Sequence, residues 1–128
     1  MACGNACVLA VAHHLEPAAS GIGTHVQLGL PPCGFLAATG LPCPACGLTT
    51  AFAHMVRLNL LDAAHVHPVG VALFMVVVAS LMACGLAAAR GWPLEDTLKR
   101  LRLERVAAII CLAAVLSWFA RLLALLSA

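Results

Sequence analysis

The sequence predicts an all-α integral membrane protein with two transmembrane helices and an amphipathic helix at the membrane interface, and it leaves a third, N-terminal span open. Hydrophobic residues make up 63% of the 128 residues and charged residues 9%, whereas soluble proteins have about 45–50% and 25%. A soluble fold would need more polar surface than these few charges provide. In addition, the 27 residues from Ala63 to Ala89 carry no formal charge. Residues 1–128 therefore form one membrane domain.

The first segment, residues 1–28, is apolar at its start but does not form a clear span. Ala2–Leu15 is shorter than a membrane-spanning helix requires and is interrupted by His13 and His14. It also lacks the basic start of a secretory signal. Three alternatives remain: a poor first span, a protein that starts further upstream, or a re-entrant loop.

The second segment, residues 29–68, combines a loop with a helix. Glycine and proline are frequent from Gly29 to Gly47, which indicates a loop with at most one helical turn at Phe35–Thr39. Hydrophobic spacing then predicts one helix over Leu48–Ala64, lying flat in the outer interface. Its expected apolar face contains Leu48, Phe52 and Met55, and its polar face contains Thr50, His54 and Arg57.

Two spans follow, at residues 69–90 and 106–126, separated by a basic connector at 91–105. The apolar run Val69–Ala89 reaches roughly 30 Å as a helix, which is the thickness of the hydrocarbon core. Pro68 suits the first turn of that helix, because a missing N–H costs nothing there. Val106–Leu126 is similar in length and composition.

The basic residues predict the orientation. Five of the seven lie between Arg90 and Arg105, so the connector should be cytoplasmic, and the cysteine-rich loop and the C-terminus should be on the outer side. Thr97–Arg105 should form a short amphipathic helix on the inner leaflet. The expected partner is the lipid bilayer, together with an unspecified membrane protein. The net charge of +2 argues against nucleic acid.

The chemistry is concentrated in Cys43-Pro44-Ala45-Cys46-Gly47. The two-residue gap between Cys43 and Cys46 is typical of a zinc knuckle, and Cys33 is a candidate third ligand. On this interpretation His65 or His67 would supply the fourth ligand and the metal would be zinc, but the sequence does not identify a cofactor.

Two other interpretations use the same thiols. A Cys-x-x-Cys pair before a helix is also the arrangement of a thiol–disulfide oxidoreductase, because the helix dipole favours thiolate. Alternatively, Cys33 forms a structural disulfide with Cys43 or Cys46, which would stabilise the loop by roughly 2–4 kcal/mol. The sequence leaves all three open, and it assigns no catalytic residue because no paired carboxylates are present.

The loop resembles a known family. The run from Thr39 to Ala51, followed by His67-Pro68 before an apolar helix, is similar to the bacterial membrane proteins catalogued as domain of unknown function 2752. That family has the pattern Thr-Gly-x-x-Cys-Pro-x-Cys-Gly-x-Thr-Arg-Ala and then Asn-Pro. Thr50 stands here in place of its arginine, and His67 in place of its asparagine. The resemblance implies a multi-pass protein of the bacterial inner membrane and no specific activity.

The sequence therefore predicts a small, non-enzymatic accessory or binding protein whose outer loop is structural or binds a metal. The alternative is a membrane oxidoreductase that uses the Cys43/Cys46 pair. No partner, pathway or oligomeric state follows from the sequence.

Overall fold

The computed structural model describes residues 2–91, 93 and 102–127. Throughout these ranges the elements are helical and there is no strand. The elements are α1 (Ala2–His14), the 3₁₀ turn η1 (Thr24–Leu28), α2 (Gly34–Thr39), α3 (Leu48–Val56), α4 (Leu60–Val66), α5 (Pro68–Arg90) and α7 (Leu103–Leu126). The all-α prediction is confirmed for the described part of the chain.

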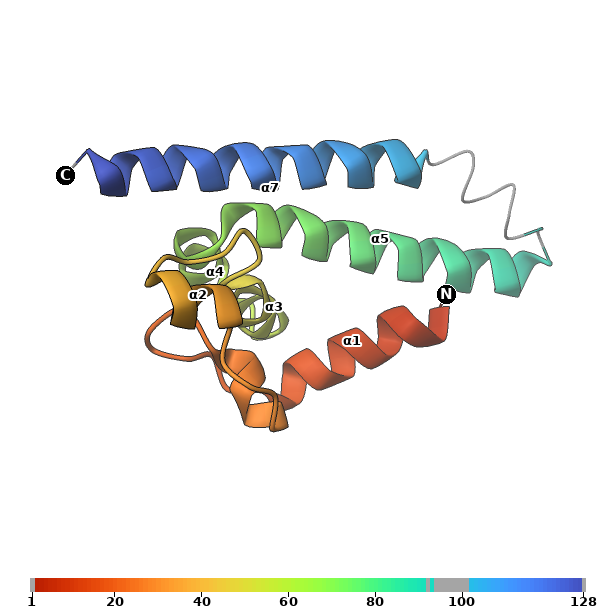
Figure 1. The fold of residues 1–128 in the computed structure, drawn as a ribbon. Helices are drawn as coiled ribbons and strands as arrows, with labels where there is room; N and C mark the ends of the chain where they lie inside the picture. The colour runs from red at the N-terminus through yellow and green to blue at the C-terminus, as the bar shows by residue number, and fades with distance from the viewer. Residues whose placement is uncertain (1, 92, 94–101, 128) are drawn as a thin grey trace.

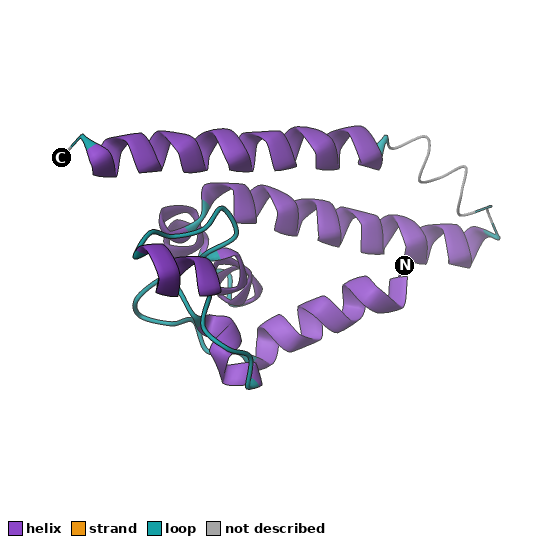
Figure 2. Ribbon diagram, viewed as in Figure 1, coloured by secondary structure: helices purple, strands orange, loops and turns teal. Residues whose placement is uncertain are grey.

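Two long helices and a cluster of short ones make up the molecule. α5 and α7 run antiparallel to each other, and the short helices gather at the end where α5 begins (Figure 1). Loops join these short helices, while α5 and α7 are uninterrupted rods (Figure 2). We call residues 15–67, which contain η1 and α2 to α4, the head.

The first predicted span agrees with α5. Pro68 occupies the first helical turn, and the helix ends at Arg90 with Gly91 in the left-handed conformation as its C-cap. Among the described residues, α5 is the one helix that is long and apolar enough to cross a membrane, which suggests membrane association.

The second predicted span coincides with most of α7, whose apolar part within the described residues is Arg105–Ala120. The connector at 91–105 and its predicted amphipathic helix at Thr97–Arg105 lie largely outside the described residues.

The N-terminal segment forms α1, which packs on α3 and α5. Asn5 Nδ2 donates a hydrogen bond to Ser80 Oγ of α5 at 2.6 Å, and Arg57 Nη2 donates to the carbonyl of His13 at 3.1 Å. The 13 residues of α1 reach about 20 Å. This is shorter than a hydrocarbon core of about 30 Å, so α1 does not by itself match a span.

The prediction of one continuous helix over Leu48–Ala64 is wrong. The helix ends at Val56, and Leu58 turns the chain with a φ of 63° before α4 begins at Leu60. The N–H group of Leu58 donates to the carbonyl of Met55, and that of Asn59 donates to the carbonyl of His54. The turn therefore provides hydrogen-bond partners for carbonyls at the end of α3. α4 then folds back against α3, a tertiary pairing that local spacing does not encode.

The predicted polar face of this helix is also partly wrong, because Thr50 is fully buried. Its hydroxyl lies 2.7 Å from the hydroxyl of Thr24 in η1, which is buried too. Phe52 and Met55 are buried as expected, and Arg57 is exposed. α3 thus lies between η1, α1, α4 and α5 rather than flat on a surface.

Candidate metal centre

Three thiols converge in the loop that precedes α3. The Sγ atoms of Cys33, Cys43 and Cys46 all lie within 4.8 Å of one another, and those of Cys43 and Cys46 are 3.1 Å apart. All three are free thiols and are half-buried. Thiolate is a preferred ligand of zinc and of other thiophilic metals. This cluster could therefore bind a metal ion.

Local turns bring these sulfurs together. Cys33 precedes α2, and Cys43 and Cys46 lie in the turn before α3, where the N–H of Cys46 donates to the carbonyl of Cys43 at 3.0 Å. Gly47 ends the turn with a φ of 92°, and a Cβ there would lie 3.1 Å from Val66 Cγ1. Only glycine fits a left-handed position this close to α4. The prediction that the motif sits at the start of a helix is confirmed.

His67 connects the cysteine loop to the start of α5. Its Nδ1 accepts a hydrogen bond from the N–H of Gly70 at 3.0 Å, and its Nε2 lies 3.0 Å from the carbonyl of Pro44. Since a backbone N–H can only donate, Nδ1 is the unprotonated nitrogen and Nε2–H donates to Pro44. The buried imidazole is therefore the N-cap of α5, the role that asparagine fills well.

Trp118 of α7 makes a second connection to the same loop. Its Nε1–H donates to the carbonyl of Pro42 at 2.7 Å. The carbonyls on both sides of Cys43 are therefore bound, one by α7 and the other by the residue that caps α5. A cavity of about 20 Å³ lies between the loop and α7, lined by Cys43, Cys46, His67 and Trp118 among others. This volume suits one water molecule or ion.

The thiols of Cys33 and Cys46 differ in pKa. The nearby backbone N–H of Leu36, together with the thiols of Cys43 and Cys46, holds the pKa of Cys33 below its ordinary value. Burial, and next the thiol of Cys43, raises the pKa of Cys46 to about 12. Three adjacent thiols cannot all ionise at neutral pH without a nearby cation, because like charges repel.

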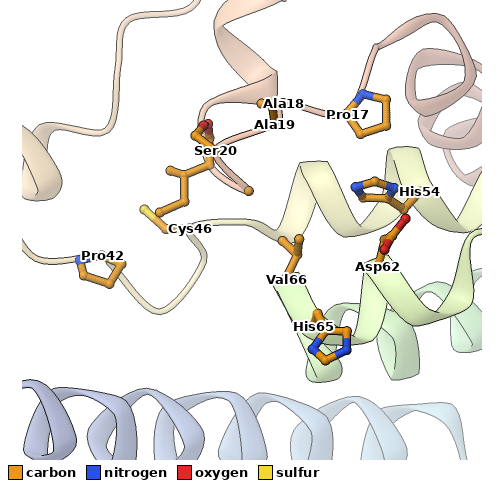
Figure 3. Close-up of a pocket in the computed structure, with 12 residues that line it drawn as sticks. Pro17, Ala18, Ala19, Ser20, Pro42, Cys46, His54, Asp62, His65 and Val66 are labelled. Atoms are coloured by element: carbon orange, nitrogen blue, oxygen red, sulfur yellow. The ribbon is translucent and has the colours of Figure 1, made fainter.

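Neither of the two predicted histidine ligands joins the group of three sulfurs. Among the described residues, the donor atoms that converge within 4.8 Å come from Cys33, Cys43 and Cys46. Both nitrogens of His67 are already engaged, as described above. His65 is exposed on α4 and lines a larger cavity that Cys46 also lines (Figure 3).

Sequence reasoning missed two contributors to this site. Trp118 donates a hydrogen bond to a loop carbonyl 76 residues away in the sequence. Thr24 is 26 residues from its partner Thr50, on the helix that follows the cysteines. No local periodicity signals such pairs.

Residues 33–81 match the family described as "Protein of unknown function (DUF2752)". The predicted resemblance is confirmed over this part of the chain. The matched region contains all three cysteines and His67, and it extends into α5. No curated protein and no solved structure matches the chain.

Proposed function

We propose that this chain is a small, non-enzymatic membrane protein that binds one thiophilic metal ion, zinc in the first place, through Cys33, Cys43 and Cys46. The observation that carries the proposal is the convergence of three sulfurs from two separate turns within 4.8 Å. A divalent cation would stabilise the thiolates that otherwise repel one another, and binding would release their protons. The carbonyl contacts of His67 and Trp118 would hold the loop in place for the ion.

Metal content tests this proposal. The full-length protein, purified in detergent under reducing conditions, should contain about one zinc ion per chain. A variant with all three cysteines changed to serine should lose it. Cys111→Ser is the matched control, because Cys111 is an exposed cysteine on α7. Equal metal content in the wild type and the triple variant would overturn the proposal.

The proposed location is the outer face of a bacterial inner membrane, with α5 and α7 crossing it and the lipid bilayer as partner. The five basic residues between Arg90 and Arg105 support a cytoplasmic connector. A periplasm-dependent reporter enzyme should be active when fused after Ala128 and inactive when fused after Asp96. Activity only after Asp96 would reverse the orientation.

A second candidate is thiol–disulfide exchange by Cys43 and Cys46, favoured by their 3.1 Å separation at the start of α3. Two thiols would lose two electrons and two protons to a disulfide or quinone acceptor, which would be reduced in turn. The pKa of about 12 at Cys46 disfavours it as the attacking thiolate. A reversible Cys43–Cys46 disulfide in metal-free wild-type protein would support this candidate.

A further inference from the structure

A cavity of about 540 Å³ adjoins the cysteine cluster. The segment from Pro17 to Ile22 lines it, together with Pro42 and Cys46 of the cysteine loop and residues of α3 and α4. Cys46 and Pro42 lie on one side and His54 and Asp62 on the other (Figure 3). The volume falls within the range of about 300–1,000 Å³ typical of small-molecule sites.

Cys46 lines this cavity and also the cavity of about 20 Å³ beneath α7. One of the three proposed metal ligands is therefore accessible from a space large enough for an organic molecule. The smaller cavity has room for about one water molecule.

The three sulfurs fill only three of the four positions that zinc normally uses. In the described part of the chain, no histidine or carboxylate donor joins them within 4.8 Å. Sites with three protein ligands keep the fourth position for water or an external ligand, as in catalytic zinc sites.

We propose that the fourth position of the bound metal opens to the 540 Å³ cavity and takes a small neutral nitrogen donor, an imidazole or an amine. This inference rests on the proposed metal binding. Water would occupy the position in the resting state, and the nitrogen donor would replace it.

Charge selects this class of ligand. Three thiolates on a divalent zinc ion carry a net charge of about −1, and an anionic fourth ligand would raise this to about −2. The titratable groups that line the cavity besides Cys46 are Asp62, His54 and His65. A neutral nitrogen donor adds no negative charge. Its own N–H can donate to a carboxylate, an arrangement common around metal-bound imidazoles. The small side chains of Pro17, Ala18 and Ala19 leave room for a ring.

Cobalt(II) provides a spectroscopic probe of this position. The full-length protein would be loaded with cobalt(II) in detergent and titrated with imidazole, while its visible d–d bands are recorded. We expect a saturable shift of these bands. Ala19→Trp, which fills part of the cavity, should weaken the apparent affinity for imidazole by about tenfold. Ala38→Trp is the matched control, because Ala38 is exposed on α2 and does not line the cavity.

The outcomes separate the two proposals. If no sulfur-to-cobalt charge-transfer band appears, the metal site and this inference both fail. If that band appears but imidazole leaves the d–d bands unchanged, the metal site stands and the open position is refuted. If imidazole acts equally on the wild type and on Ala19→Trp, the ligand enters by another route and the assignment to this cavity is wrong.

Discussion

The head contains fully buried side chains, whereas α7 leaves many apolar side chains exposed. In the head, Ala51, Ala53 and Thr50 are fully buried, and buried hydroxyls are paired with each other. On α7, Ile109, Leu112 and Leu123 are 61–66% exposed. The head is thus stabilised by hydrogen bonds within it and by packing that includes Val71 and Phe74 at the start of α5. The long helices satisfy their backbone internally but leave apolar side chains uncovered, which suits lipid better than water.

The two ends of α5 show this contrast within one helix. Near its start, Gly70 faces the head, and a Cβ there would lie 3.0 Å from the Cβ of Ala51. Further along, Gly85 has nothing within 4 Å of its Cβ position. The same substitution at these two glycines therefore measures how tightly each end is packed.

We expect the largest effect from Gly70→Leu. The added side chain would push α5 away from α3, with a loss of about 3 kcal/mol in the free energy of unfolding. Gly85→Leu should be neutral or slightly stabilising, because leucine favours a helix more than glycine does. Chemical unfolding in detergent measures both. Similar losses of stability at the two positions would show that α5 is packed no more tightly at the end that meets the head than at its other end.

The next effect concerns the junction between the two regions. His67→Ala removes the N-cap of α5 and the hydrogen bond to Pro44, and should cost about 2 kcal/mol. His67→Asn supplies a side-chain oxygen that can accept from Gly70 N–H in place of Nδ1, and it should cost about half as much. If both variants lose the same stability, the imidazole does not act as a cap. Neither should lose metal completely, because His67 is not needed as a ligand.

A smaller effect is expected where α7 meets the loop. Trp118→Phe keeps an aromatic ring but removes the N–H that donates to Pro42, at a cost of about 1 kcal/mol. Leu112→Ala is the control and should leave stability nearly unchanged, since Leu112 is exposed on the same helix. Unchanged stability in Trp118→Phe would mean that α7 is not attached to the cysteine loop.

The thiols within the head should also differ in reactivity. In metal-free protein at pH 8, Cys33 should be alkylated before Cys46, because its pKa lies below the ordinary 9.0 while that of Cys46 is about 12. Raising the pH further should increase alkylation of Cys46 long after Cys33 has levelled off. Mass spectrometry of the labelled peptides measures the order, and faster labelling of Cys46 would contradict it.

The sequence predicts the parts of this structure that depend on composition and local spacing. α5 follows from an uncharged run and a proline, and the cysteine turn from glycines and prolines around the motif. The turn at Leu58 was not predictable, because it depends on α4 packing back onto α3. His67 was assigned as a ligand candidate because a sequence does not show that its ring bonds to a carbonyl 23 residues away.

X-ray absorption at the zinc edge tests the central proposal most directly. The full-length protein, loaded with zinc under reducing conditions, should show three sulfur ligands at about 2.3 Å and one lighter nitrogen or oxygen ligand at about 2.0–2.1 Å. A first shell made only of nitrogen and oxygen would contradict the account, and so would a protein that takes up no zinc while its three thiols are reduced.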